Sequence, residues 1–358
     1  MFLVSICVTP FGYDDTVIHA LGRLAWAGLI PAYGVGIVGL VAALALMARF
    51  PGESILDYAP RVLGPVAGRA YLILLGLMLL WGAAGNLSTM AGVVQVIELP
   101  RMPLLVPAWI LAALLCYACY FGPEVVARSA EVFFWPIAFG FLFIFFAPLA
   151  TAQPANLLPL SGFPWARYAN PSVASTLGTV RGFLCLLVLG GAVRGAGRRM
   201  AAPAVLGLSV AWLLLALSLA LPVMDLGVGL ADLVRYPIVV VGGTVSFRWF
   251  PFQRLTLVLG LVWEMVMYVV LGFYLWSGVH VLCGALGIRR WRLWLIPAAA
   301  LTGAVGSLPL RPSLAQLLLN TWDFSVVVIG AICPLLLLAI ARLRGRTATR
   351  VRGREHAA

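Results

Sequence analysis

Long apolar runs separated by short polar stretches recur along the whole chain. The nine complete runs cover about residues 24–48, 70–97, 104–121, 132–150, 174–193, 201–223, 253–287, 293–309 and 318–341. A helix rises 1.5 Å per residue, so runs of about 20 residues cross the roughly 30 Å of hydrocarbon in a bilayer. Outer-membrane barrels instead show segments of about ten residues in which apolar and polar side chains alternate. The pattern therefore predicts an all-α integral membrane protein.

The first apolar run, residues 1–11, is only about half as long as a span, since it would extend about 16 Å as a helix. Counted as an incomplete span, it brings the expected number of transmembrane helices to about ten. We expect an in-frame upstream extension of about 15–20 residues that would complete this first span.

A stretch with four prolines, residues 151–173, divides the expected spans into two groups of five. Its prolines and aromatic residues predict an extended interfacial loop. An odd number of spans in each half is typical of an inverted repeat. We therefore expect a polytopic membrane domain at 1–341, with repeat one at 1–150 and repeat two at 174–341, followed by an Arg-rich tail at 342–358.

A polar interruption, residues 122–131, separates the runs at 104–121 and 132–150. Gly122 and Pro123 cannot continue the preceding helix, because Gly costs backbone entropy and Pro lacks an N–H. A new helix is expected to start there, in which Glu124, Arg128 and Glu131 fall at helical spacings of four and three, so that both acids can reach Arg128. A solvated loop with a surface ion pair is the alternative.

Composition and charge support the membrane class and predict its orientation. Hydrophobic residues make up 63% of the 358, charged residues 10%, and the mean hydropathy is +1.05, whereas a soluble domain has roughly 25% charged residues. The net charge of +12 comes from arginines at the ends of apolar runs, which is typical of topology signals rather than of a nucleic-acid surface. With the N-terminus inside, inner connections hold 16 arginines and outer ones seven. Both termini are therefore expected in the cytoplasm.

No pattern of catalytic or metal-binding residues occurs in the sequence. The six cysteines lie within or beside apolar runs, and Cys116 and Cys119 form a C-x-x-C without a second pair. Ser/His/Asp, His-rich and phosphate-loop arrangements are missing from the sequence. We therefore expect neither an enzyme nor a bound metal or cofactor.

Five groups of residues carry a resemblance to a known family. They are Phe50-Pro51-Gly52-Glu53-Ser54 with Gly64, Leu99-Pro100-Arg101-Met102-Pro103, Gly122-Pro123-Glu124 through Glu131, Asn156-Leu157-Leu158-Pro159-Leu160, and Tyr236-Pro237 leading to Arg254-Leu255 and Trp263. Their order and spacing resemble the B subunits of spore nutrient germinant receptors. These are the GerAB-type spore germination proteins of the amino acid/polyamine/organocation transporter superfamily, and the resemblance covers nearly the whole chain.

The resemblance implies a transporter-like fold of ten helices in which helices one and six are broken, with a small-nutrient site between them. It also implies a role in germinant sensing in the inner membrane of dormant spores, with A and C receptor subunits as partners. Two positions depart from the family pattern. Phe183 follows Gly182 where the family often has an acid, and Gln253 stands where an acid commonly precedes the Arg at the start of span eight.

Two ionisable residues stand out inside apolar runs, Arg181 in the sixth span and Glu264 in the eighth. Charges at this depth cost roughly 2.5–3.5 kcal/mol on insertion scales and usually face a cavity or a partner. In the resembled fold both would lie in the site, where Arg181 suits a carboxylate and Glu264 suits an ammonium group. Alternatively, Arg181 reaches the interface, or the two neutralise each other. Supporting ligand-binding candidates, set against ordinary helix packing, are Thr9, Pro10, Asn86, Thr89, Thr179 and Gly182.

The leading functional hypothesis is a membrane receptor subunit that binds a small nutrient, such as an amino acid, and signals germination to its partner subunits. The alternative is an ion-coupled amino acid permease of the same fold, since fold does not fix function. A concentrating permease would need an ion coupled to alternating access, whereas a receptor needs only different affinities for the ligand in two conformations.

Overall fold

The computed structural model describes residues 14–159, 162–163, 165–193, 198–234, 236–244 and 255–347, and every regular element in them is helical. The α-helices are α2 (Asp14–Leu21), α3 (Ile30–Arg49), α4 (Ile55–Leu63), α5 (Pro65–Ile97), α6 (Leu105–Tyr120), α7 (Pro123–Phe146), α8 (Pro171–Ala174), α9 (Phe183–Leu189), α10 (Arg198–Leu233), α11 (Pro237–Thr244), α12 (Leu255–Ala285), α13 (Trp291–Gly306), α14 (Pro312–Ser325) and α15 (Cys333–Leu343). A π-helical segment, η8 (Val326–Ile332), joins α14 to α15. Short 3-10 turns include η6 (Ser175–Gly178), directly after α8.

The helical membrane class predicted from the apolar runs is confirmed. In the described part of the chain, six helices are long and apolar enough to cross a bilayer, and a bent pair of helices at 171–192 makes up to seven. The two helices α6 and α13 are shorter, at 16 residues each. Each of the nine complete runs in the sequence contains a helix. The expected first span, with Thr9 and Pro10, lies outside the described residues.

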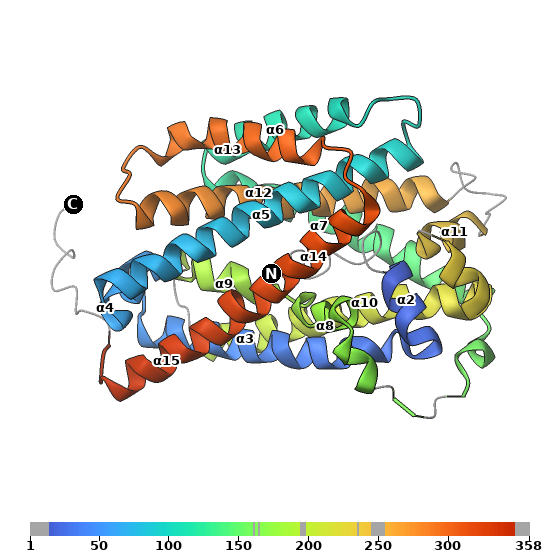
Figure 1. Ribbon diagram of the computed structural model, residues 1–358, viewed down its shortest axis with the longest axis horizontal. Helices are drawn as coiled ribbons and strands as arrows, with labels where there is room; N and C mark the ends of the chain where they lie inside the picture. The colour runs from blue at the N-terminus through green and yellow to red at the C-terminus, as the bar shows by residue number, and fades with distance from the viewer. Residues whose placement is uncertain are drawn as a thin grey trace.

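The long helices lie side by side in two groups (Figure 1). In one group, α12 packs along α5 and α7, and α13 packs along α5 and α6; in the other, α3 contacts α10, α9 and α15. Small residues bring the helices close: a Cβ on Gly278 of α12 would lie 2.7 Å from Leu80, and one on Gly76 of α5 would lie 3.0 Å from Leu282. Close backbone approach of this kind favours helix association in lipid.

The polar interruption after α6 forms the predicted helix start. Gly122 has φ +100°, which ends α6, and α7 begins at Pro123. Arg128 pairs with Glu124 at 2.7 Å, and both side chains are more than 70% exposed. The predicted span at 132–150 therefore belongs to a helix that starts nine residues earlier, at Pro123.

The stretch between the apolar runs at 201–223 and 253–287 is helical over much of its described length. The first helical part of α10 runs past 223 to a kink at Gly227, where φ is +73° and ψ is 161°, and a second helical part ends at Leu233. Helix α11 follows. The apolar run at 201–223 therefore ends within a few residues of this kink, and a short helical part follows it.

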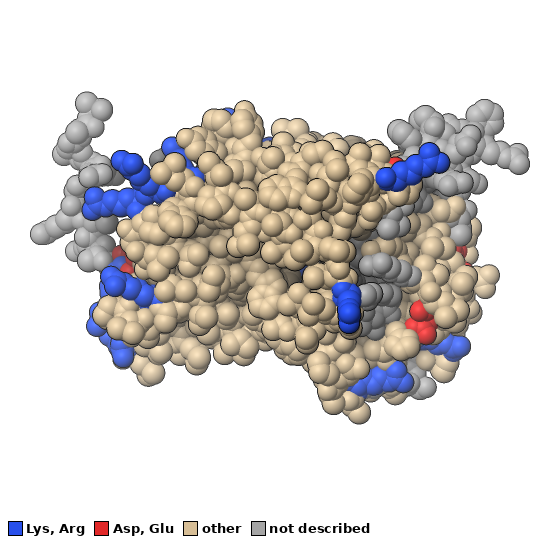
Figure 2. All heavy atoms as spheres, turned by 45° about the horizontal axis from the view of Figure 1, so that its top comes forward, with Lys and Arg blue, Asp and Glu red and all other residues tan. Residues whose placement is uncertain are grey.

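On the face shown in Figure 2, most of the arginines lie towards the two ends of the molecule, and a broad band between them has no charged side chains. At one end, Arg49 donates hydrogen bonds to the carbonyls of Ala341 (2.9 Å) and Arg346 (2.6 Å), and Arg344 donates to Val62 O (2.7 Å). The other end contains Arg23 and Arg167, which donate to the carbonyls of Leu158 and Ala20. The connections assigned to one side of the membrane thus meet at one end of the helix bundle.

Candidate functional site

The sixth predicted span is broken at residues Thr179–Gly182. One half, Pro171–Gly178, and the other, Phe183–Ala192, are bent by 49° at this break. Close packing holds the break on two sides. A Cβ on Gly178 would lie 2.3 Å from the carbonyl oxygen of Asp323 in α14, and one on Gly36 in α3 would lie 2.8 Å from Val180 O. The broken sixth helix implied by the family resemblance is thus present.

The break presents one charged side chain, Arg181, to α14. Its Nη1 lies 2.5 Å from Oδ1 of Asp323, and both side chains are 1% exposed. The guanidinium carbon lies 4.0 Å from the ring centroid of Trp322. A charge that is buried this deeply needs a partner, because leaving it unpaired in a low-dielectric interior is very costly. Asp323 and the face of the Trp322 indole meet that need.

A row of polar side chains extends this contact towards the first half of the broken helix, Pro171–Gly178. Asn320 of α14 accepts a hydrogen bond from Ser175 (3.0 Å) and is bonded through Nδ2 to the hydroxyl of Ser172 (3.1 Å). Two turns of α14 are therefore joined to α8, η6 and the break by side-chain hydrogen bonds and one ion pair. Any movement of the broken helix must shift α14 or break these contacts.

Asp323 is a functional candidate that the sequence analysis missed, and its contact with Arg181 replaces the alternative in which Arg181 and Glu264 neutralise each other. The carboxyl of Glu264 instead lies near that of Glu98, at the end of α5. The Glu98 carboxyl has room there because Gly260 of α12 has no side chain; a Cβ on Gly260 would lie only 2.9 Å from Glu98 Oε1. On α12, Glu264 precedes Tyr274, the residue beside Trp322, by ten positions or about 15 Å. The structure therefore places Arg181 and Glu264 in separate polar clusters.

The other expected site residues divide between the break and α5. Thr179 and Gly182 lie in the break with Arg181, and the buried Thr179 hydroxyl finds no hydrogen-bond partner among the described residues. On α5, Asn86 donates to Gly82 O (2.7 Å) and Thr89 donates to Gly85 O (3.2 Å), so both bond their own helix. Of these four residues, only Thr179 and Gly182 lie in the break itself.

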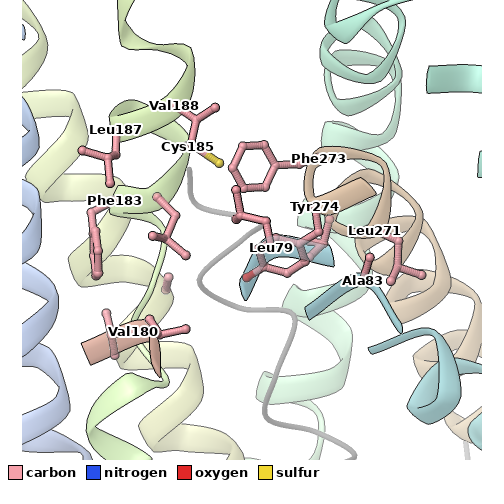
Figure 3. Close-up of a cluster of buried hydrophobic side chains, with 14 of the residues drawn as sticks. Leu79, Ala83, Val180, Phe183, Cys185, Leu187, Val188, Leu271, Phe273 and Tyr274 are labelled. Atoms are coloured by element: carbon pink, nitrogen blue, oxygen red, sulfur yellow. The ribbon is translucent and has the colours of Figure 1, made fainter. Parts of the chain in front are cut away.

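Apolar side chains fill the space around the break. Figure 3 shows Cys185 and Val188 of α9 opposite Phe273 of α12, with Leu79 of α5 beside them. Phe183, where the family often has an acid, is 1% exposed, and a Cβ on Gly39 of α3 would lie 2.9 Å from its ring. An acid at this position would be buried among hydrocarbon groups. The Arg181–Asp323 pair is thus closed off by apolar packing.

This arrangement is chemically suited to a small zwitterion. A guanidinium binds a carboxylate in a planar two-bond geometry, and a carboxylate accepts hydrogen bonds from an ammonium group. Arg181 and Asp323 supply one group of each kind within one buried cluster. Among the residues that the structure describes, no cluster of His, Cys, Asp or Glu could hold a metal ion.

Comparison with known proteins agrees with the resemblance drawn from the sequence. A family model described as "Spore germination protein" matches residues 1–304, which is most of the 358-residue chain. A search of curated proteins finds no match. The chain belongs to the family of spore germination proteins.

Proposed function

We propose that this protein is the membrane subunit of a spore nutrient germinant receptor, which binds a small amino acid and signals germination to A and C partner subunits. Family membership supports a role in germination. The observation that carries the binding role is the buried Arg181–Asp323 pair at the break of a membrane helix. Charged groups at such depth usually serve a ligand or ion path.

The ligand would act by replacing one ionic partner with another. Its carboxylate would bind Arg181 and its ammonium group Asp323, in place of their direct bond of 2.5 Å. Thr179 in the same break would supply a hydroxyl to the ligand. Because α14 is joined to the broken helix through this pair, exchange of partners would favour a different position of α14. A ligand shifts such an equilibrium only by its difference in affinity for the two states.

Binding of radiolabelled amino acids to the purified protein tests this function. We expect Arg181→Ala and Asp323→Asn each to lower the affinity for the bound amino acid by at least about tenfold, which corresponds to about 1.4 kcal/mol. Arg128→Ala is the matched control, because its ion pair is exposed at the surface. Unchanged affinity in both buried variants would exclude the site, and no binding by any amino acid would exclude the function.

An ion-coupled amino acid permease is the second candidate, favoured by the contact between Glu98 and Glu264. Two neighbouring carboxylates repel each other unless one of them carries a proton, so this pair could hold a coupling proton. Reconstituted protein separates the candidates. Proton- or sodium-driven accumulation of a labelled amino acid in vesicles would support the permease, whereas binding without accumulation would support the receptor.

For the receptor we also propose the inner membrane of the spore, with both termini in the cytoplasm. The Arg-rich end formed by Arg49, Arg344 and Arg346 would then face the cytoplasm. This orientation follows the excess of arginines that cytoplasmic connections usually carry.

A further inference from the structure

Trp322 lies between the buried ion pair and a groove that is lined by α5, the end of α13 and α14. One face of its ring covers the guanidinium carbon of Arg181 at 4.0 Å. The same residue lines the groove between α5, the end of α13 and α14. The Trp322 side chain, which is 2% exposed, therefore separates the ion pair from the groove.

The groove runs from the connection before α14 towards the middle of the bundle. Leu310 lies in that connection, whereas Leu319 and Trp322 line the groove further along α14. Across from them, Gly85 and Thr89 of α5 contribute to the opposite wall. The space is about 80 Å³, close to the volume that two or three water molecules occupy at about 30 Å³ each. Its lining is mainly apolar and includes the hydroxyl-bearing residues Ser88 and Thr89 of α5.

The position of the Trp322 indole, called its seat below, is defined by close contacts with α5 and α12. Its Nε1 donates a hydrogen bond of 2.8 Å to the carbonyl oxygen of Met78 on α5. One turn further along α5, a Cβ on Gly82 would lie 2.4 Å from the indole ring. Tyr274 of α12 meets the ring edge-on, with centroids 5.7 Å apart. One hydrogen bond to α5 and ring contacts with Tyr274 and Arg181 therefore hold the Trp322 side chain in place.

The helix that carries Trp322 also has a point at which it can change register. The π-helical segment Val326–Ile332 begins four residues after Trp322. Such segments are uncommon and are frequent at functional sites. Rotation of α14 at this segment would carry Trp322 and Asp323 together.

We propose that Trp322 is a gate, and that the groove beside it is the path by which a small carboxylate-bearing molecule reaches Arg181. With the indole in its seat, the ion pair is sealed from the groove. With the indole displaced, the groove and the pair become one space with an apolar wall and a charged end. This inference rests on the proposed ligand site at Arg181, but the gate is testable without any ligand.

Chemical modification of Arg181 by phenylglyoxal, followed by peptide mass spectrometry of the full-length purified protein, measures whether the gate is closed. Phenylglyoxal reacts with accessible guanidinium groups. In the unmodified sequence Arg181 should react far more slowly than the exposed Arg101 and Arg311. Trp322→Ala should raise the rate at Arg181 by about tenfold or more, since the seal is then lost.

Two matched variants separate the gate from a general loosening of the protein. Trp81→Ala enlarges the same groove and should leave the Arg181 rate unchanged, because the cover on the guanidinium remains. Gly85→Trp should fill the groove, since a Cβ there meets Leu319 only at 3.8 Å. Combined with Trp322→Ala, it should return the Arg181 rate to that of the unmodified sequence. The rate at Arg49, at the other end of the molecule, should stay constant throughout.

Each outcome decides the proposal. A slow modification rate at Arg181 in Trp322→Ala would overturn the gate. A fast rate that Gly85→Trp does not reduce would overturn the groove as the path. If Trp322→Ala does not fold, Trp322→Phe removes only the bond to Met78 and should raise the rate by a smaller factor that Gly85→Trp again reverses. Expected modification rates in a protein that binds no amino acid would leave the gate standing and exclude the proposed function.

Discussion

Arg181 and Asp323, 142 residues apart in sequence, form an ion pair of 2.5 Å across the break in a membrane helix, with each side chain 1% exposed. This contact joins the second half of the broken helix to α14, and Trp322 covers it on the α5 side. Neither charge could be tolerated there alone, so the two positions depend on each other. The pair therefore supplies charged groups that could bind a ligand, and it connects the broken helix to α14.

The first prediction concerns the energetics of this pair. Arg181→Ala and Asp323→Ala should each destabilise the protein by about 3–5 kcal/mol, because each leaves an uncompensated buried charge. The double variant Arg181→Met/Asp323→Leu should lose much less stability than the sum of the two single changes, because no buried charge remains. Unfolding in detergent, followed by circular dichroism against added denaturant, measures these differences. The exposed Arg128–Glu124 pair is the control, where removing Arg128 should change stability by less than about 1 kcal/mol.

The second prediction tests the seat of the Trp322 indole on α5. Gly82→Ala places a methyl group 2.4 Å from the ring, so the ring must move or α5 must separate from α14. Overpacking of this kind costs about 1–3 kcal/mol. Gly85→Ala, on the same helix, adds a methyl group at an ordinary 3.8 Å contact and should be nearly neutral. Equal thermal stability of the two variants would show that the indole is not held at Gly82.

The helices of this protein were largely predictable from sequence because a bilayer restricts the choice. Backbone groups in hydrocarbon must bond within their own segment, so long apolar runs become helices. The break at Thr179–Gly182 also left a signal, since Thr179, Arg181 and Gly182 interrupt an otherwise apolar run. Polar and flexible residues at mid-depth thus indicated where the structure departs from a continuous helix.

Asp323 was missed because the start of its helix was placed too late. The apolar run at 318–341 indicates a helix that starts at about 318, which would place Asp323 near the membrane interface, where an acid needs no partner. Helix α14 begins at Pro312, so Asp323 lies eleven residues, or about 16 Å, inside it. The pairing of Arg181 with Asp323 rather than Glu264 depends on helix packing, which no local pattern encodes. The one available signal was an acid that could neutralise a lone intramembrane arginine.

The third prediction is the orientation of the protein in the membrane. A cysteine introduced at the exposed Thr347, in a cysteine-free background, should be protected from a membrane-impermeant maleimide added to intact cells. A cysteine at the exposed Ala155, in the connection between α7 and α8, should be labelled. Permeabilised cells provide the control, because both positions should then react. Labelling of Thr347→Cys from outside would reverse the proposed orientation.

The last prediction separates the two polar clusters by their roles. Glu264→Gln keeps a hydrogen-bonding group beside Glu98 but removes the carboxyl that would share a proton with it. Because Glu264 lies about 15 Å along α12 from Tyr274 at the Trp322 cluster, this change should alter amino acid affinity by less than about twofold. Arg181→Ala, measured in the same equilibrium binding assay, should lower the affinity by about tenfold or more. A large loss of affinity in Glu264→Gln would show that the ligand reaches α12 at Glu264, and it would move the site from the break in the sixth span to the carboxyl pair.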